Sequence, residues 1–291
     1  MPPKVRIAML NADTPVPNVL SAWDTYGNMF HDLLVAAASR IAPDVEIQSI
    51  NYDTQRLEYP RSLDEIDVIL VTGSASSSYD DKVWIKRLDQ FLIDVYTHHP
   101  RIKIFGSCFG HQLVCECLLR DYGVRVEKDP KGWELGVKEI KLNETFRKRL
   151  GKSAKSFLKT DRNTETPENL RVQFVHADHV MIPSPDALPS SWVAVGTTSH
   201  CAVQGVYEPG RVFTLQGHFE FNRFVNTEIM KVFGATWEPQ LLQETFEAID
   251  ADDDAEVAAE MVLQFLLEKE ELAGSGAHQV LGGLLTPPLA E

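Results

Sequence analysis

The feature of this sequence that most restricts its fold is a regular alternation of short apolar runs with helix-patterned segments. Residues 5–10 (VRIAML) and 45–50 (VEIQSI) flank residues 26–40, whose apolar side chains recur at the spacing of one helix face. Residues 66–73 (IDVILVTG) form a nearly continuous apolar run that ends in glycine, and residues 101–106 (RIKIFG) supply another predicted strand of this kind. Strands that are apolar along their whole length belong inside a parallel sheet covered by helices on both faces.

We therefore predict an α/β fold with a doubly wound, mostly parallel sheet, arranged as a flavodoxin-like three-layer sandwich. The helical spacing of residues 83–99 supplies a connection between two of the predicted strands. In the second half of the chain the strand-like segments lie closer together, at 133–142, 171–176, 192–196, 201–207 and 211–217. Because little chain separates several of them, we expect antiparallel additions to the sheet there. Ligand sites in such folds lie in loops at the carboxyl ends of the strands.

Domain organisation follows from the same patterns. Residues 1–250 are predicted to form one domain, and a C-terminal helix at 251–272 is appended to it after the acidic stretch DADDDAE. Negative charge of this kind complements the dipole at a helix N-terminus. Residues 273–291 are rich in glycine and proline and show little patterning, so we expect a flexible tail.

Charge and composition exclude several classes of partner. The formal net charge is −14, from 28 basic and 42 acidic residues, and the chain has no basic run interleaved with aromatic residues, so we expect no nucleic acid partner. No apolar stretch reaches the length of a membrane helix, and the N-terminal apolar run is too short for a signal peptide. Four cysteines are too few for a disulfide framework, which predicts a reducing, cytoplasmic location.

Residues 105–112 (FGSCFGHQ) place Cys108 between two glycines, after a predicted strand and before the helix-patterned residues 113–119. This is the construction of a nucleophile elbow, in which a sharp turn lifts a reactive side chain above the sheet. Exposed N–H groups at the helix N-terminus favour the thiolate, which is the nucleophilic form. The backbone N–H of Phe109 would then point to where an oxyanion develops. An inert buried cysteine is the weaker interpretation, because packing alone does not call for GHQ after it.

A nucleophilic cysteine requires a base, and the base usually has an orienting partner. Among nine histidines, His218 is the best placed, because it follows an apolar strand in the stretch TLQGHFEFN. Glu220 lies two residues later, where an extended segment aims both side chains to the same side. Cys108, His218 and Glu220 are therefore the predicted catalytic triad.

Other polar residues have simpler interpretations. His176, Asp178 and His179 could be taken for a metal cluster, but a hydrogen-bonded loop near the site is the better interpretation, and we expect no metal. Cys115 and Cys117 lie two residues apart on a predicted helix, which suits packing rather than zinc binding. The serine run after residue 73 lacks the lysine of a phosphate-binding loop.

The order of these motifs, G-x-C-x-G-H-Q after a strand and then G-H-x-E, resembles the class I glutamine amidotransferases. That family carries a Cys-His-Glu triad on a doubly wound α/β domain, and the resemblance extends from about residue 5 to residue 233. Further stretches are similar to the free-standing GMP-synthase-like branch, which contains plant γ-glutamyl peptidases and fungal homologues. They are VTGSASSSYDD (71–81), KGWELG (131–136), VHADHV (175–180) and AVQGVYEPGRVFTLQGHFEF (202–221).

The resemblance implies a reaction and a role for each matching residue. Cys108 would attack the γ-carbonyl of glutamine or a γ-glutamyl peptide, His218 would act as the base, and Glu220 would orient it. Water would then hydrolyse the γ-glutamyl thioester, and no cofactor is implied. The other implied positions are an oxyanion hole from the backbone of Gly73 and Phe109, and contacts to the glutamyl group from Gln112 and Ser74.

Three interpretations of the activity stay open. The first is a hydrolase of small-molecule γ-glutamyl substrates, which needs no partner. The second is a glutaminase subunit that delivers ammonia to a separate synthase partner, since no phosphate-binding loop for activating an acceptor is visible here. The third is a non-catalytic binding or regulatory protein on the same fold, against which the intact triad argues.

The sequence departs from the family pattern at two positions beside the triad. Phe219 stands where the family usually has proline, which puts the angle between His218 and Glu220 in doubt. Ser107 stands where a branched apolar residue is common.

Overall fold

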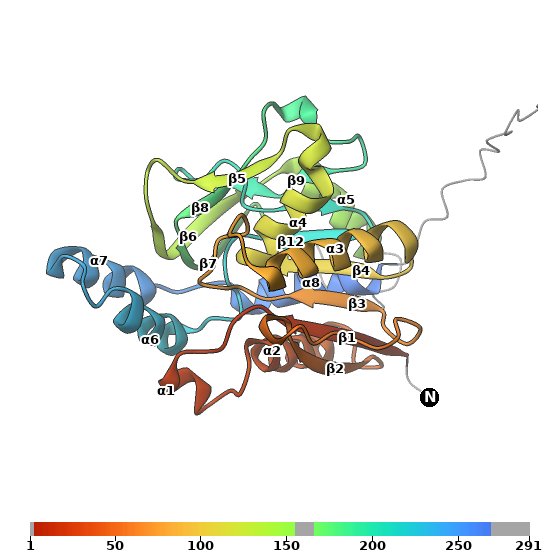
Figure 1. The fold of residues 1–291 in the computed structure, drawn as a ribbon, viewed down its shortest axis with the longest axis horizontal. Helices are drawn as coiled ribbons and strands as arrows, with labels where there is room; N and C mark the ends of the chain where they lie inside the picture. Colours follow the sequence, from red (N-terminus) through yellow and green to blue (C-terminus); the bar gives the residue numbers. More distant parts are fainter. Residues whose placement is uncertain (1–2, 155–165, 269–291) are drawn as a thin grey trace, which may run out of the picture.

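A seven-stranded sheet runs through the middle of the computed structural model, which describes residues 3–154 and 166–268 (Figure 1). Its strand order is β2-β1-β3-β4-β12-β11-β9. The first five of these strands are parallel, and β11 and β9 add antiparallel strands at one edge. The predicted α/β fold, mostly parallel with antiparallel additions, is confirmed. In chain order the strands are β1 (Lys4–Asn11), β2 (Glu46–Asp53), β3 (Val68–Val71), β4 (Lys103–Ser107), β9 (Val193–Ala194), β11 (Val206–Glu208) and β12 (Val212–Leu215).

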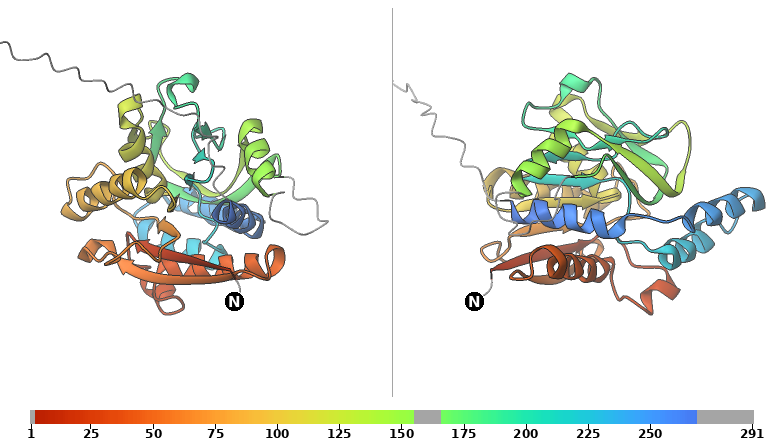
Figure 2. Two further views of the ribbon diagram at one scale, coloured as in Figure 1. Left: turned by 90° about the vertical axis from the view of Figure 1, so that its right-hand side faces the viewer. Right: turned by 180° about the vertical axis from the view of Figure 1, so that it is seen from behind.

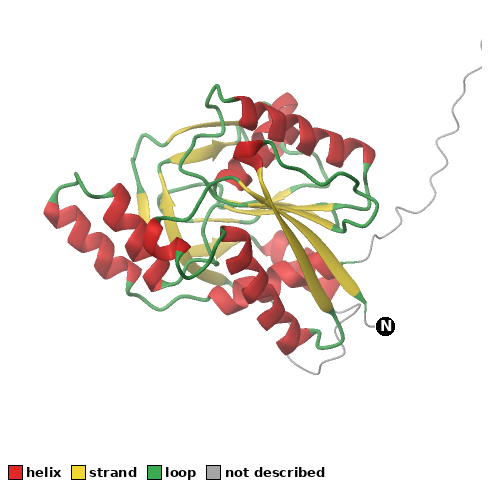
Figure 3. Cartoon of the chain, turned by 60° about the horizontal axis from the view of Figure 1, so that its bottom comes forward, coloured by secondary structure: helices red, strands yellow, loops and turns green. Residues whose placement is uncertain are grey.

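Helices cover both faces of this sheet (Figures 2 and 3). Successive side chains of a strand point to opposite faces, so Ile7 and Met9 of β1 join one core cluster, whereas Ala8 and Leu10 join the other. Both faces are therefore buried, which explains the continuous apolar runs in the sequence. The first cluster includes α2 (Tyr26–Ile41), α5 (Glu144–Ala154) and α8 (Ala255–Leu267), and the second includes α3 (Val83–His98) and α4 (Phe109–Leu119).

The second half of the chain differs from the sequence-based expectation in how its strands pair. Two short sheets stand apart from the central one, with orders β10-β6-β7 and β5-β8. The segment 211–217 supplies β12, which lies parallel to β4 rather than antiparallel to it. Parallel neighbours need a long crossover, and the chain between β4 and β12 provides one. These strands are β5 (Arg125–Lys128), β6 (Glu134–Leu142), β7 (Asn169–His176), β8 (Asp178–Met181) and β10 (Gly196–Thr197).

Three further helices lie toward one end of the molecule, on the left of Figure 1. They are α1 (Pro17–Leu20), α6 (Arg223–Phe233) and α7 (Pro239–Ile249), and α1 and α6 share a small core with Tyr26 and Phe221. Short 3-10 helices occupy Thr54–Arg56, Arg120–Tyr122 and Pro185–Ala187. This end holds the carboxyl ends of the parallel strands, where α/β folds place their ligands.

The C-terminal helix α8 is packed into the core rather than lying on the surface. Ala258, Val262 and Leu263 are fully buried in the cluster that contains α2 and the sheet. The expected tail at 273–291 lies outside the described residues. None of the helices within the described ranges is both long and apolar enough to cross a membrane. All four cysteines are free thiols.

Candidate active site

Cys108 lies in a strained turn between β4 and α4. Its φ of 51° and ψ of −106° are sparsely populated for any residue other than glycine. The Cys108 N–H donates to the carbonyl of Leu215 in β12 at 2.8 Å, and the Cys108 carbonyl accepts from the N–H of Gln112 at 3.0 Å. The neighbouring strand and the first turn of α4 therefore hold the strained residue in place. This is the geometry of a nucleophile elbow.

The two glycines that flank the elbow let α4 lie directly on the sheet. A Cβ atom on Gly106 would lie 2.6 Å from the backbone of Gly110, and one on Gly110 would lie 2.4 Å from the carbonyl oxygen of Val71 in β3. Both separations are shorter than atoms tolerate, and both involve backbone that has little room to move. The G-x-C-x-G spacing thus follows from backbone packing around the cysteine.

His218 and Glu220 form a buried hydrogen-bonded pair after β12. The Nδ1 of His218 lies 2.7 Å from Oε1 of Glu220, and their side chains are 3% and 1% exposed. Because a carboxylate only accepts, Nδ1 of His218 donates the proton in this bond, and Nε2 is left as the nitrogen that can exchange a proton with the thiol. Nε2 has no hydrogen-bond partner among the described residues, so it is available for proton transfer.

Phe219 does not disturb this pair, although the family usually has proline at its position. Its ring turns away from the site into the core, where it packs edge-on against Phe30 at 5.3 Å and Phe105 at 6.0 Å between ring centres. The extended backbone sends alternate side chains to opposite sides, so His218 and Glu220 share the other side.

Cys108, His218 and Gly73 meet at one point. A Cβ atom on Gly73 would lie 2.9 Å from Cε1 of His218 and 3.6 Å from Cβ of Cys108, so the absence of a side chain at Gly73 admits the imidazole. The ring of Phe221 stacks on the imidazole at 4.0 Å with an interplanar angle of 5°. Burial alone would lower the pKa of His218, but the Glu220 carboxylate and the Cys108 thiol raise this pKa to about 10.

Two residues that the sequence-based prediction missed, Ser107 and Phe221, contact Glu220 and His218. The Ser107 hydroxyl is fully buried and donates to Oε1 of Glu220 at 3.3 Å, so the departure at this position gives the carboxylate a second donor. The GHFEF run in the sequence could have suggested that Phe221 lies beside His218. Nothing in the sequence indicated that Ser107 contacts Glu220.

A pocket of about 520 Å³ opens over the triad. Gly73, Ser74, Cys108, Gln112 and His218 all line it, so five of the seven predicted site residues share one cavity. Glu220 lies behind His218, and the side chain of Phe109 turns into the core beside Trp84, leaving only its backbone for the site.

The two residues expected to contact the glutamyl group are themselves held by the pocket wall. The Gln112 amide donates to the carbonyl of Asp178 at 2.9 Å and to Oε1 of Gln216 at 3.0 Å. The Ser74 hydroxyl donates to Oδ2 of Asp13 at 3.2 Å. These bonds keep the wall in one arrangement, which is what a pre-organised site requires.

A buried ion pair stiffens the far side of the same wall. His176 Nε2 lies 2.9 Å from Glu134 Oε2, and its Nδ1 lies 2.9 Å from the carbonyl of Asp178. Burial raises the pKa of Glu134, but hydrogen bonds from His176, Thr198 and Gln204 outweigh it and hold this pKa below its ordinary value. The 176–179 segment, expected to be a loop, is instead the end of β7 and the start of β8, joined at Ala177. No cluster suited to a metal occurs among the described residues.

His111 of the GHQ motif lies beneath the elbow and not in the pocket. Its Nδ1 is 2.8 Å from the hydroxyl of Thr214, and the residue is fully buried. Burial and the nearby His176 lower its pKa to about 3, so the imidazole is neutral at physiological pH. His111 packs under the pocket, whereas His218 lines it.

Comparison with known proteins agrees with this geometry. The family model described as "Glutamine amidotransferase class-I" matches residues 23–234. The chain belongs to this family. A glutamine amidotransferase-like protein of Schizosaccharomyces pombe is 30% identical to this family member over 90% of the chain and 98% of the relative. Gamma-glutamyl peptidase 3 of Arabidopsis thaliana is 27% identical, over 58% of the chain and 60% of the peptidase.

Solved structures show the same fold at lower identity. A glutamine amidotransferase from Thermotoga maritima aligns with a TM-score of 0.55 and 20% identity, covering 90% of this amidotransferase-family chain and 94% of its own. A glutamine amido transferase from Methylobacillus flagellatus aligns with a TM-score of 0.57 and 19% identity, covering 91% and 92%. These likenesses bear on the fold alone.

Proposed function

We propose that this class I glutamine amidotransferase family member hydrolyses the γ-glutamyl amide bond of glutamine or of small γ-glutamyl peptides. The observation that carries the proposal is the meeting of Cys108, His218 and Gly73 at the floor of one pocket, with His218 held by Glu220. A nucleophile, a base and an orienting carboxylate in this order are the components of acyl transfer.

The reaction begins when Sγ of Cys108 attacks the γ-carbonyl carbon while Nε2 of His218 holds the thiol proton. The backbone N–H groups of Phe109 and Gly73 stabilise the oxyanion that forms. Collapse of this intermediate breaks the C–N bond, and the departing amine takes the proton from His218. A water molecule then gives its proton to His218 and attacks the thioester, and glutamate leaves as the Cys108 thiol re-forms.

Two observations support hydrolysis without a partner. The pocket of about 520 Å³ is larger than a glutamine side chain requires, and one wall carries apolar side chains, including Val16, Ile229 and Phe233. Space and apolar surface beyond the triad suit a substrate whose leaving group is more than ammonia. The resemblance to γ-glutamyl peptidases points the same way.

The alternative is a glutaminase subunit that passes ammonia to a synthase partner. The similarity to a protein described as glutamine amidotransferase-like favours it. On this alternative glutamine is the substrate, and its hydrolysis rises when the partner is bound. Both alternatives use the same triad and differ in the leaving group. We also propose a cytoplasmic location, which the four free thiols support.

The test measures glutamate release from glutamine, from γ-glutamylglycine and from glutathione, with Cys108→Ala as the control. Release from the peptides that far exceeds release from glutamine supports the partner-free hydrolase. Release from glutamine alone favours the glutaminase subunit. Release that survives in Cys108→Ala contradicts the proposed mechanism.

A further inference from the structure

One positively charged side chain that lines the active-site pocket, that of Lys128, has no ion-pair partner among the described residues. Lys128, at the end of β5, is the only lysine or arginine among the described residues that line it. Its ammonium forms no hydrogen bond or ion pair with the part of the chain that the structure describes. A lysine without a carboxylate partner beside a nucleophile is available to a ligand.

The acidic side chains of the same pocket are already engaged. The carboxylate of Asp13 accepts hydrogen bonds from the N–H groups of Thr14 and Ala75 and from the hydroxyl of Ser74. The carboxylate of Asp178 accepts from two hydroxyl groups, at 2.5 Å from Ser77 and 3.0 Å from Tyr79. Neither forms an ion pair with Lys128.

The backbone of Lys128 is held in a fixed place relative to the nucleophile. Lys128 pairs with Asp178 across the β5–β8 ladder. The carbonyl of Asp178 accepts from Gln112, one turn after Cys108, and lies 2.9 Å from Nδ1 of His176. Lys128 therefore pairs with a strand, β8, that two hydrogen bonds tie to the elbow and to the buried Glu134–His176 pair.

From these observations we propose that Lys128 binds a free carboxylate of the substrate and makes this carboxylate a requirement for tight binding. The inference rests on the proposed function and narrows its substrate class. The chain as a whole carries a net charge of −14, so an anionic substrate gains from a local cation in the pocket. The carboxylate has two sources in a γ-glutamyl peptide, the α-carboxylate of the glutamyl group and the C-terminal carboxylate of the leaving group.

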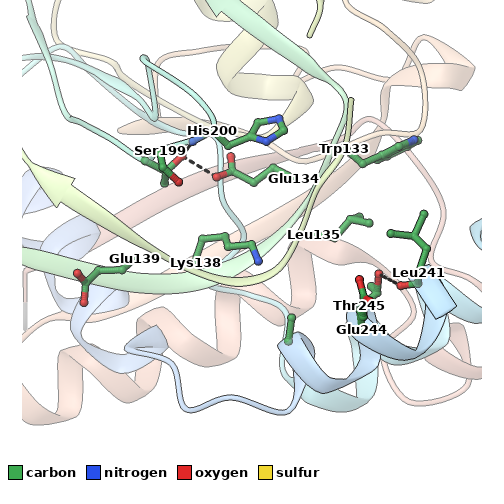
Figure 4. Close-up of a pocket in the computed structure, with 12 residues that line it drawn as sticks. Trp133, Glu134, Leu135, Lys138, Glu139, Ser199, His200, Leu241, Glu244 and Thr245 are labelled. Carbon is green, nitrogen blue, oxygen red and sulfur yellow. Dashed lines mark hydrogen bonds between the residues drawn. The ribbon is translucent and has the colours of Figure 1, made fainter. Parts of the chain in front are cut away.

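A second lysine provides a matched control. Lys138 lines a neighbouring hollow of about 500 Å³, and Trp133 borders both cavities. Figure 4 shows Lys138, Trp133 and Glu134 around this second hollow. Lys138 does not line the pocket that contains Cys108, so its removal changes the charge of the protein equally without changing the proposed contact.

The test measures binding by calorimetry in the Cys108→Ala background, where ligands stay intact. The ligands are γ-glutamylglycine, the same peptide with its C-terminal carboxylate as an amide, and the same peptide with its α-carboxylate as an amide. With Lys128 present, one of the two amides binds roughly tenfold more weakly than the acid, as loss of a charge-assisted hydrogen bond predicts. That amide identifies the carboxylate that Lys128 binds.

In Cys108→Ala/Lys128→Met the acid and that amide bind equally, Lys128→Arg keeps the preference, and Lys138→Met leaves it unchanged. A preference that persists in Lys128→Met overturns the inference, and so does equal binding of all three ligands with Lys128 present. Binding with the expected preference, but without glutamate release by the unmodified chain, overturns the hydrolysis and leaves the role of Lys128 standing. Failure of every ligand to bind overturns both.

Discussion

Replacing Gly73 by alanine perturbs the triad at a single contact. The new Cβ would lie 2.9 Å from Cε1 of His218, about half an ångström closer than the 3.4 Å at which ordinary contact begins. His218 is buried between the Phe221 ring and the Glu220 carboxylate, so it has to shift as a unit. Gly73 is not among the residues with positive φ, so its backbone accepts alanine.

A displacement of this size at a catalytic base lowers kcat by roughly tenfold to a hundredfold, equivalent to about 1.4–2.7 kcal/mol of barrier. The assay compares kcat for glutamate release with the melting temperature of the same preparation. We expect kcat to fall while the melting temperature stays near that of the unmodified protein, because Gly73 lies beside the pocket rather than in the core clusters.

Gly151→Ala is the matched control. Gly151 lies in α5, where the nearest contact of a Cβ atom among the described residues is the Thr166 hydroxyl at 3.8 Å. This variant keeps its kcat and gains up to about 1 kcal/mol of stability from helix propensity. Full kcat in Gly73→Ala, or a fall of kcat and melting temperature together, would contradict a specific contact between this Cβ atom and His218.

Three further perturbations test other contacts. Ser107→Ala removes the second donor to Glu220 and lowers kcat roughly twofold to tenfold with KM unchanged, and unchanged kcat contradicts this role. Glu134→Gln lowers the free energy of unfolding by roughly 3–5 kcal/mol at neutral pH by leaving His176 without its anion. Folding lowers the pKa of Glu134, so the Glu134 carboxylate stabilises the folded protein at any pH above its pKa in the unfolded chain. This stabilisation is lost as the pH falls through the pKa of Glu134 in the folded protein. The melting temperatures of Glu134→Gln and of the unmodified protein therefore converge in acid. Gly110→Ala costs roughly 3 kcal/mol or more in urea denaturation, because its Cβ meets backbone, and a smaller loss argues against the tight packing of α4.

The central sheet could be predicted because its strands are buried on both faces. Residues 66–73 are apolar along nearly their whole length and end in glycine, and residues 101–106 also end in glycine, which favours short buried strands over helices. β6 and β7 gave no comparable information. Buried, half-exposed and exposed positions are mixed along both strands, and such a pattern does not say which sheet a strand joins.

In the candidate site too, the sequence indicates some residues and gives no sign of others. Cys108, His218 and Glu220 could be proposed from the sequence because each lies in a short motif whose spacing suggests its chemistry. The contact from Ser107 to Glu220 joins residues 113 positions apart, and the Glu134–His176 pair joins residues 42 apart. Only the folded chain brings such residues together, so a single sequence cannot reveal them.

We propose above that Cys108 forms a covalent γ-glutamyl thioester. This adduct can be trapped by mixing the protein with a γ-glutamyl substrate, quenching the reaction with acid during turnover, and mapping modified peptides by mass spectrometry. A γ-glutamyl group is expected on the peptide that contains Cys108, and no adduct is expected in Cys108→Ala. Glutamate release without this adduct and with full activity in Cys108→Ala would contradict this proposal.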